Sequence, residues 1–249
     1  MPNIFLLGET GLVEMSEQPY DSEDLLQRLL AEHPSVLAGD QFTTEEPRRW
    51  LLVRREAGVP DGDDASARWS LDHLFLDQDG VPTLVEVKRS SDTRIQREVV
   101  GQMLDYAANA VAYWPAGLIR EQFAACESDG LPSAERLAAF LGLVDEAIES
   151  EKVDRFWQSV DTNLKAGRVR LVFVADSIPP ELRRVVEFLN SQMNPAEVLA
   201  IEIKQFIGSG VKTLVPTVIG QTARTSTIRA GAQARGSQWN RGIVPRRAT

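Results

Sequence analysis

The sequence predicts an α/β protein in which helices flank a central mixed β-sheet. The first observation is a hairpin signal, because two strand-like segments are separated by the turn-forming residues 77–80. The second is a helical periodicity of apolar residues before and after these strands. The third is a strand, a helix and a strand between residues 168 and 206, an order that favours parallel pairing through a crossover. Antiparallel and parallel pairs together would make the sheet mixed.

The N-terminal half opens with a helix that has clear start and stop signals. Asp21 or Ser22 provides an N-cap, leucines between residues 25 and 30 form an apolar face, and Pro34 ends the helix. The elements predicted for this half are a helix at residues 24–33, strands at 48–56, 68–76 and 82–88, and a helix at 95–112, with a loop at 57–66 and a short strand at 112–114.

The C-terminal half is predicted to be helical first and then to return to the sheet. Residues 132–166 are mostly helical, with breaks near Gly142 and in the acidic run at residues 149–154. After Pro216 the chain is rich in Gly, Ala, Ser, Thr and Arg, so we expect it to be disordered or to depend on a partner. The elements in between are a strand at 168–176, a helix at 179–193 and a strand at 197–206.

Composition and length are those of an ordinary globular protein. With 249 residues, 43% hydrophobic and 25% charged, the chain suits one compact domain with appendages. No apolar run approaches the roughly 18 residues of a membrane span, and the opening residues lack a signal-peptide pattern. We therefore expect a cytoplasmic protein without a membrane partner. The single cysteine, Cys126, excludes an internal disulfide and gives no zinc motif.

The net charge of −9 is unevenly distributed. Residues 221–249 contain six arginines and no acid, which leaves 21 basic and 36 acidic residues, a net charge of −15, on residues 1–220. A body this acidic is unlike a protein that coats DNA through many phosphate contacts. If the chain binds nucleic acid, we expect the contact to be local or assisted by a metal ion.

The segment with candidate chemistry is the strand TLVEVKRS. Side chains alternate along a strand, so Glu86 and Lys88 project on one face while Val85 and Val87 project on the other. Asp72 lies on the preceding strand, and pairing about the turn can bring it near Glu86, with the register left open. Carboxylates that hold a divalent metal suit phosphodiester hydrolysis, because the metal activates water and stabilises negative charge. An E-x-K pattern alone is more often a surface ion pair.

The wider arrangement is more specific than this one strand. S-L-D-H is followed by a hairpin, then by V-E-V-K-R, and then by a helix that carries G-Q-M-L-D-Y. Over residues 21–114 this order resembles the PD-(D/E)XK phosphodiesterase superfamily, particularly its RecB-like and NucS-like branches with a Q-x-x-x-Y motif. The resemblance implies a restriction-endonuclease-like core (αβββαβ) within residues 1–131. The helical segment and strand-helix-strand unit within residues 132–220 lie outside the match, and they would extend the same sheet, form a dimer contact or shape the substrate groove. The arginine-rich tail follows at 221–249.

The resemblance also implies a role for each matching residue. Asp72 and Glu86 would be ligands of Mg²⁺ or Mn²⁺, and Lys88 would orient or activate the attacking water. The other implied positions are a metal-ligating carbonyl at Val87, a border formed by Gln102 and Tyr106, and a metal ligand at Glu23 with Asp24 and Glu32 as rivals. Two of these have ordinary alternatives: the first-turn acid suits the helix dipole, and a lone tyrosine is more often a core residue.

Basic residues near the proposed site are candidates for phosphate contacts. Arg89, Arg94 and Arg97 follow the E-x-K strand, and guanidinium groups fit phosphate oxygens, but a solvated helix start explains them equally well. His73 neighbours Asp72 on a strand and should face away from it, so we predict a structural role for the histidine.

A second E-x-K pattern occurs at Glu202 and Lys204. A helix precedes it in place of a hairpin strand bearing an aspartate, and no Q-x-x-x-Y helix follows. We interpret this segment as a strand with a polar face.

Three classes of function compete on these observations. The first is a metal-dependent nuclease in DNA repair or defence against foreign DNA, with DNA favoured over RNA as the substrate and a homodimer favoured if it cuts duplexes. The second is a catalytically silent module on the same fold that binds nucleic acid or a protein. The third is a structural or regulatory protein with an acidic surface, which would have no affinity for metal.

Overall fold

A computed structural model of the chain describes residues 4–8, 11–42, 46–60, 67–90, 98–115, 117–126, 130–143 and 146–221. Its strands are β1 (Ile4–Gly8), β2 (Gly11–Gln18), β3 (Trp50–Pro60), β4 (Ala67–Asp77), β5 (Pro82–Lys88), β6 (Arg170–Ala175), β7 (Glu197–Gly208) and β8 (Val211–Ile219). Its helices are α1 (Glu23–Glu32), α2 (Glu98–Tyr113), α3 (Leu118–Ala125), α4 (Ser133–Leu141), α5 (Glu146–Lys165) and α6 (Pro180–Gln192), with short 3₁₀ helices η1 (Pro34–Leu37) and η2 (Gly39–Gln41).

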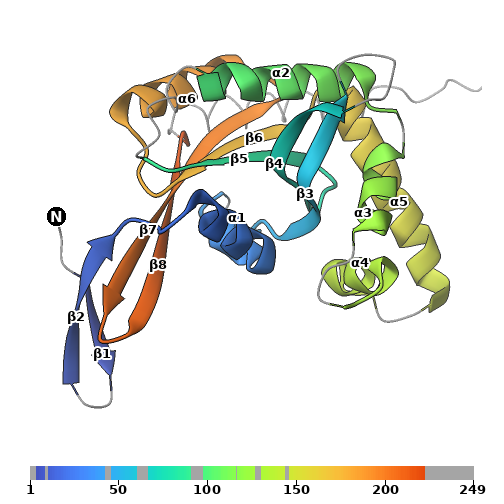
Figure 1. Cartoon of the computed structure of the whole chain (residues 1–249). Coiled ribbons are helices and arrows are strands. Elements are labelled where there is room, and N and C mark those ends of the chain that lie inside the picture. The colour runs from blue at the N-terminus through green and yellow to red at the C-terminus, as the bar shows by residue number, and fades with distance from the viewer. Residues whose placement is uncertain are drawn as a thin grey trace, which may run out of the picture.

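The predicted mixed α/β architecture is confirmed. The eight-stranded sheet has the order β1-β2-β7-β6-β5-β4-β3, and β8 also pairs with β7 (Figure 1). The strands β5, β6 and β7 are parallel neighbours, whereas β3, β4 and β5 pair antiparallel. The parallel crossover predicted from the strand-helix-strand segment is therefore present, and its strand β6 lies directly beside β5.

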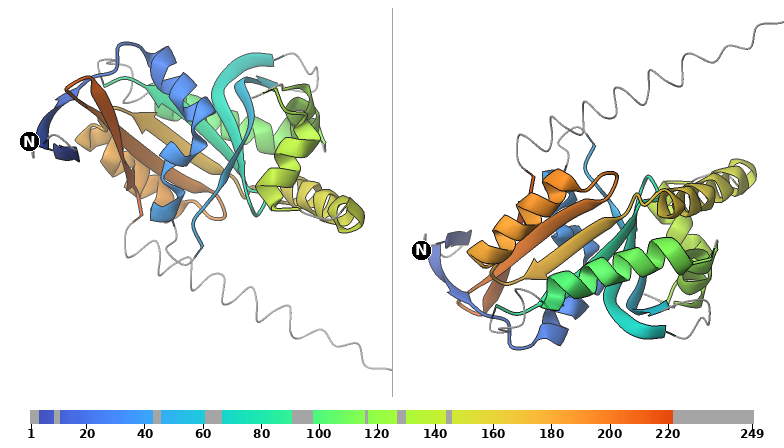
Figure 2. Two further views of the ribbon diagram at one scale, coloured as in Figure 1. Left: turned by 90° about the horizontal axis from the view of Figure 1, so that it is seen from below. Right: turned by 90° about the horizontal axis from the view of Figure 1, so that it is seen from above.

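The sheet carries a hydrophobic core on each face. Residues from α2, α3, α4, α5 and α6 pack together on one side, whereas α1 and η1 cover the other (Figures 1 and 2). Alternation along β5 places Leu84 in the first core and both Val85 and Val87 in the second. Because β5 is buried on both faces, any polar side chain on it must be accommodated by specific partners.

The N-terminal β-hairpin is attached to the distal part of β7. β2 pairs with residues 205–207 of β7, whereas β6 pairs with residues 197–202 and β8 with residues 200–208. A strand has only two edges, so β2 and β6 share one edge of β7 and β8 has the other. The hairpin β1–β2 consequently projects from the body of the protein, as Figure 1 shows.

Several predicted elements are confirmed closely. β5 has the predicted bounds, and the predicted cap of α1 is Ser22, whose Oγ accepts a hydrogen bond of 3.1 Å from the backbone N–H of Leu25. The strand at 168–176 and the helix at 179–193 correspond to β6 and α6. None of the helices within the described residues is long and apolar enough to cross a membrane.

Other predictions were wrong, each for a local reason. Residues 57–60, predicted as the start of a loop, belong to β3 and pair with β4, and the rest of that predicted loop lies outside the described residues. Residues 112 and 113 end α2 and do not form a strand. α5 runs without a break through residues 149–154, where the side chains of Glu151 and Arg155 form an ion pair of 2.6 Å one helical turn apart.

The sequence also contains elements that its patterns did not predict. These are the hairpin β1–β2, the helix α3 and the strand β8. β8 continues to Ile219, so residues 217–219, predicted as part of the tail, belong to a strand, and residues 222–249 lie outside the described residues. In β8 the proline Pro216 obscures the strand pattern, and long pairing with β7 overrides this local signal.

Candidate active site

The candidate site lies where β4 and β5 separate. The two strands pair from Leu76 and Pro82 as far as His73 and Val85. Beyond that point β4 continues along β3, and β5 continues along β6 until Lys88 lies beside Ala175. The divergence leaves backbone groups of β5 without a partner strand on one side, and it opens space for side chains.

Asp72 fills part of this opening. Its Oδ2 accepts a hydrogen bond of 2.7 Å from the backbone N–H of Val87, a group that a continued ladder would have paired with β4. A carboxylate that accepts a backbone N–H is held firmly. Asp72 is thereby fixed against the strand that carries Glu86 and Lys88.

The ammonium of Lys88 stands among four oxygen atoms of the predicted site. Its Nζ lies 3.0 Å from Glu86 Oε1, 3.3 Å from Glu23 Oε1 and 3.7 Å from Asp72 Oδ2. The same group donates a hydrogen bond of 2.9 Å to the carbonyl oxygen of Val87. The fold thus brings together residues from α1, β4 and β5 that are up to 65 positions apart.

Glu86 is the most buried member of this cluster. Its side chain is 2% exposed and lies against apolar residues of α2, β6 and α6 that include Val99, Phe173 and Leu182. Within the described part of the chain, Glu86 Oε2 is buried with no hydrogen-bond partner. Burial, together with the nearby charge of Asp72, raises the pKa of Glu86 to about 7. A buried, unpaired carboxylate oxygen of this kind is suited to a cation.

The other two charged groups respond to the same environment. Burial raises the pKa of Asp72, and the positive charge of Lys88 only partly opposes this effect. For Lys88, burial alone would lower the pKa, but the surrounding carboxylates Asp72, Glu86 and Glu23 outweigh it and raise the pKa. Lys88 therefore remains an ammonium at neutral pH, so it supplies positive charge and hydrogen-bond donors.

Gln102 and Tyr106 border the site from α2, one helical turn apart. The side-chain amide of Gln102 donates to the hydroxyl of Tyr106, which donates a bond of 3.1 Å to the carbonyl oxygen of Ser70. The ring of Tyr106 is buried in the core beneath α2. Tyr106 thus ties α2 to β4 two residues before Asp72, which gives this tyrosine a positioning role.

Replacing Tyr106 by phenylalanine is expected to lower the free energy of unfolding by about 1 kcal/mol, because Ser70 and Gln102 lose a hydrogen-bond partner. Thermal unfolding of Tyr106→Phe should show a decrease of roughly 2–4 °C. Tyr113→Phe is the matched control, since Tyr113 lies on the same helix and is 46% exposed. Equal melting temperatures for both variants would contradict the positioning role.

Of the three predicted phosphate-binding arginines, only Arg89 lies within the described residues; Arg94 and Arg97 lie outside them. Arg89 follows Lys88 directly and donates a long hydrogen bond of 3.4 Å to the carbonyl oxygen of Asp21. Its Nε is buried without a partner among the described residues. Arg89 is therefore next to Lys88 in the chain, with one guanidinium donor that has no partner among the described residues.

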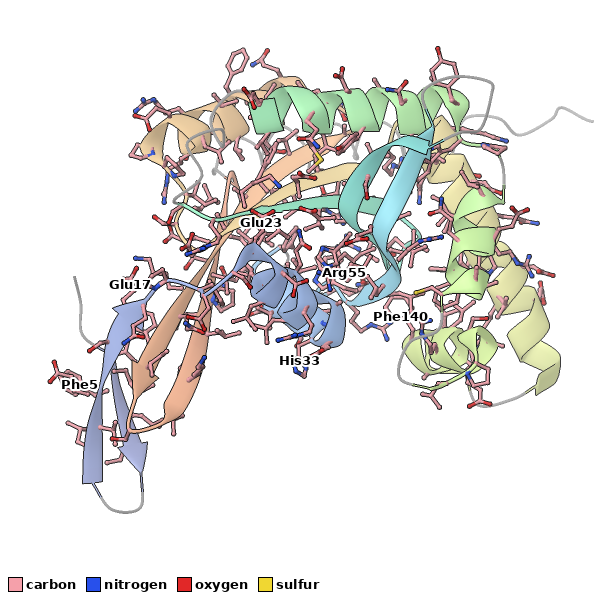
Figure 3. All side chains as sticks on the ribbon, in the orientation of Figure 1. Phe5, Glu17, Glu23, His33, Arg55 and Phe140 are labelled. Carbon is pink, nitrogen blue, oxygen red and sulfur yellow. The ribbon has the colours of Figure 1, made fainter. Side chains whose placement is uncertain are left out.

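The acidic residues of α1 separate into distinct partners. Glu23 contacts Lys88, whereas Asp24 pairs with Arg55 of β3, and Glu32 at the far end of the helix lies 3.9 Å from Arg28. Glu23 and Arg55 are labelled in Figure 3. Of the three candidates for the first-helix ligand, Glu23 is the one that reaches the cluster.

Two residues near the site were not found from the sequence. Arg55 acts on Asp72, because its positive charge partly offsets the effect of burial on the aspartate pKa. Asp176 follows β6 and accepts hydrogen bonds of 2.6 Å from Ser90 N–H and 3.1 Å from Ser177 N–H, which anchors the segment after Lys88. An acid directly after a buried parallel strand was the available signal for Asp176, since the carboxyl ends of such strands meet.

His73 and the second E-x-K pattern have structural partners. His73 is fully buried, its Nε2 lies 2.8 Å from the carbonyl oxygen of Gln27 in α1, and burial lowers its pKa to about 4. Glu202 accepts a hydrogen bond of 2.9 Å from Ile178 N–H. Lys204 lies 3.1 Å from Glu17. Each of these groups therefore has a packing or pairing partner other than Asp72, Glu86 and Lys88.

The donor set fits a magnesium ion held by few protein ligands. No group of three or more His, Cys, Asp or Glu side chains within the described ranges is arranged to hold a metal as it stands. Magnesium, however, commonly binds through one or two carboxylates and keeps several waters. Asp72 and Glu86 meet that requirement, since both contact the same ammonium and one Glu86 oxygen is unpaired.

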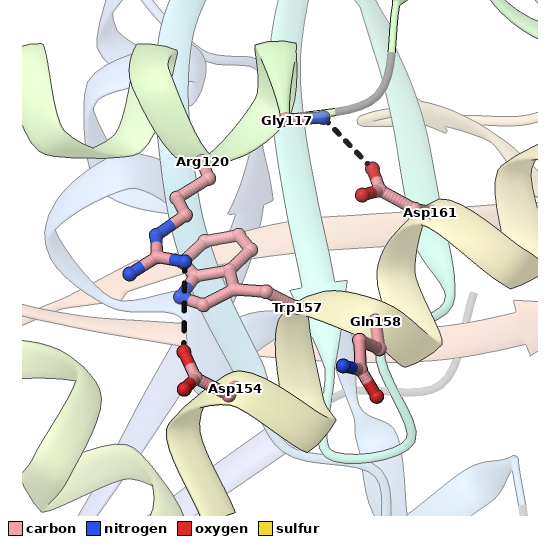
Figure 4. Close-up of a pocket in the computed structure, with 6 residues that line it drawn as sticks. All are labelled: Gly117, Arg120, Asp154, Trp157, Gln158 and Asp161. Atoms are coloured by element: carbon pink, nitrogen blue, oxygen red, sulfur yellow. Dashed lines mark hydrogen bonds and ion pairs between the residues drawn. The ribbon is translucent and has the colours of Figure 1, made fainter. Parts of the chain in front are cut away.

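A separate pocket of about 210 Å³ between α3 and α5 has no comparable chemistry (Figure 4). Arg120 lies 3.7 Å from Asp154 there, and Asp161 accepts a hydrogen bond from Gly117 N–H. Its charged groups are thus paired with each other or with backbone. We therefore place the candidate active site at Asp72, Glu86 and Lys88.

No family model, no curated protein and no solved structure matches this chain.

Proposed function

We propose that this protein is a metal-dependent nuclease that hydrolyses phosphodiester bonds in DNA. The observation that supports it best is the convergence of Asp72, Glu86 and Lys88 at the divergence of β4 and β5. A surface ion pair would not explain why Glu86 is 2% exposed and keeps one oxygen unpaired. The resemblance to the PD-(D/E)XK superfamily gives these same three residues the central roles.

The carboxylates of Asp72 and Glu86 would hold Mg²⁺ or Mn²⁺, with the carbonyl of Val87 and the side chain of Glu23 as neighbouring oxygens. The bound metal would activate water and stabilise negative charge on the phosphate. Lys88 would supply a fixed positive charge beside the reacting phosphate, because its ammonium is held among these oxygens. Tyr106 and Gln102 would keep α2 and β4 in place around the site.

The charge distribution supports a local mode of DNA binding. Residues 1–220 carry a net charge of −15, so the body as a whole repels phosphate. Arg89 follows Lys88 in the chain, the charge of Arg55 acts on Asp72, and each arginine has a buried Nε without a partner among the described residues. These guanidinium groups would contact phosphates next to the scissile bond. A role in DNA repair or in defence against foreign DNA follows from such an activity.

Cleavage is expected to depend strictly on a divalent metal. Purified protein incubated with labelled single-stranded, duplex and branched DNA should cut in Mg²⁺ or Mn²⁺, stop cutting in EDTA, and resume when excess Mg²⁺ is restored. Gel electrophoresis of the products measures the effect, and a labelled RNA of the same sequence tests the choice of substrate. Undiminished cleavage in EDTA, or intact DNA of every form with both metals, would contradict the proposal.

A catalytically silent module is the second candidate, and one observation favours it. The carboxylates contact Lys88, and no cage of three metal-binding side chains is present in the described part of the chain. This alternative predicts that DNA is bound and remains intact. Calorimetry with Mg²⁺ separates the two proposals, because only the nuclease requires metal binding that is lost in Glu86→Gln.

A further inference from the structure

The projecting hairpin β1–β2 carries an unusual concentration of exposed apolar side chains. Four side chains contribute, with exposed fractions of 50% for Phe5, 38% for Leu6, 79% for Leu7 and 65% for Leu12. Soluble proteins rarely gather exposed large apolar residues in this way unless the surface contacts a partner. Figure 3 labels Phe5 on this hairpin, well away from the helices.

The hairpin has one covered face and one open face. Cross-strand register pairs Leu7 with Leu12 and Leu6 with Val13, so alternate residues divide between the faces. On the Val13 face, β2 passes so close to β7 that a Cβ on Gly208 would lie 2.8 Å from the sulfur of Met15. Met15 is buried there. The opposite face is the open one, and it carries Phe5, Leu7, Leu12 and the exposed Glu14, which lies opposite Phe5.

The outer edge of β1 is also open. β1 is the terminal strand of the sheet order, and within the described residues it pairs with β2 alone. Its sequence IFLLG contains no charged residue and no proline, the features that usually protect an edge strand from pairing with another chain. The backbone of β1 is therefore available to extend the sheet.

We propose that β1 pairs antiparallel with β1 of a second copy of this chain, so that the protein forms a symmetric dimer. Pairing centred on Leu6 would place Phe5 of each copy opposite Leu7 of the other. Such aromatic–aliphatic pairs across antiparallel strands are favourable. Both copies contribute the same residues to this contact, as a two-fold interface requires, so the assembly ends at a dimer.

Charge and size favour a second copy as the occupant. A basic partner would bind the acidic body of the protein, and the uncharged strand β1 would offer it no electrostatic attraction. Two acidic bodies repel each other, and contact through projecting hairpins keeps them apart (Figure 1). The available surface is a strand of 5 residues with a few exposed apolar side chains, which is small for a stable interface. We therefore expect a reversible dimer whose population depends on concentration.

Sedimentation velocity of the full chain across the micromolar range tests the dimer. The native protein should shift from monomer to dimer as concentration rises, and Leu7→Lys should raise the dissociation constant more than about tenfold because a charge would enter the interface. Phe188→Lys is the matched control, since Phe188 is 62% exposed on α6 and should leave dimerisation unchanged. Leu12→Lys provides a second variant on the same open face if Leu7→Lys fails to fold.

Amide hydrogen exchange of the native protein distinguishes edge pairing from other contacts. Residues 4–8 should exchange more slowly at high concentration than at low concentration, because outward N–H groups of β1 become bonded across the interface. A native protein that stays monomeric, species larger than a dimer, unchanged exchange in β1, or equal effects of Leu7→Lys and Phe188→Lys would each overturn the proposal. These readouts do not involve DNA cleavage, so they stand apart from the nuclease proposal.

Discussion

Replacing Lys88 by alanine is expected to reduce metal-dependent DNA cleavage by at least about 100-fold, the scale seen when a preorganised charge is removed from an active site. Lys88 Nζ lies between Glu86 and Asp72 at 3.0 and 3.7 Å, and the carboxylates keep it positively charged. The variant should lose rate and should still bind Mg²⁺, since the two carboxylates remain. Initial cleavage rates at saturating metal, with calorimetry for metal binding, measure the two effects separately.

Lys204→Ala is the matched control for this substitution. Lys204 stands in the second E-x-K pattern, and its ammonium pairs with Glu17 at 3.1 Å, whereas Lys88 contacts Asp72 and Glu86. A partly exposed pair of this kind contributes about 0–1 kcal/mol to stability, so the control should fold and cleave as the native protein does. If Lys88→Ala cleaves at the native rate, or if Lys204→Ala loses as much activity, the assigned site is wrong.

The fold near the site was predictable because local patterns and tertiary packing agree there. β5 combines an apolar run with a turn signal, and it is buried on both faces, so its predicted bounds are correct. The sequence did not fix the register between β4 and β5, so it left open whether Asp72 lies near Glu86. This proximity is decided by the divergence of β4 and β5 and by the hydrogen bond from Val87 N–H to Asp72.

The missed parts depend on partners distant in the chain. Arg55 acts near Asp72 only because β3 pairs beside β4, and Asp176 anchors Ser90 only because β6 joins the sheet parallel to β5. Asp24 pairs with Arg55, and Glu23 is the acid that contacts Lys88. The sequence alone did not show which of the two acids Arg55 would pair with. The strand β1 lacks the usual alternation because Phe5 and Leu7, on its open face, are as apolar as Ile4 and Leu6 on the other face.

Replacing Glu86 by glutamine is expected to stabilise the metal-free protein at neutral and alkaline pH while removing its response to Mg²⁺. Burial and the charge of Asp72 raise the pKa of Glu86 from the ordinary value of 4.5 to about 7. Between these two values the folded state binds the proton more tightly than the unfolded chain does, so this group makes stability fall as pH rises through that window. The loss of stability is complete above the pKa of Glu86 in the folded state, and there is no loss below its ordinary pKa.

The neutral amide of Glu86→Gln does not titrate, so the stability of this variant relative to the native protein should increase with pH. In EDTA we expect Glu86→Gln and the native protein to have similar free energies of unfolding near pH 4.5. At pH 8 the free energy of unfolding of Glu86→Gln should be higher by on the order of 1 to 3 kcal/mol, measured by chemical denaturation. The hydrogen bond from Lys88 is retained, because the amide oxygen still accepts it. Glu202→Gln is the control, since Glu202 accepts a backbone N–H from Ile178 and lies outside the cluster.

Magnesium should reverse this order of stability. If the proposed site is correct, the metal will bind the folded native protein and raise its free energy of unfolding with ligand concentration, whereas Glu86→Gln will lack the carboxylate needed for that stabilisation. A buried carboxylate that destabilises the fold without metal is what a site selected for ion binding requires, and packing alone gives no reason to keep it. If Glu86→Gln is less stable than the native protein at pH 8, or responds equally to Mg²⁺, then Glu86 has a structural role and the metal site lies elsewhere.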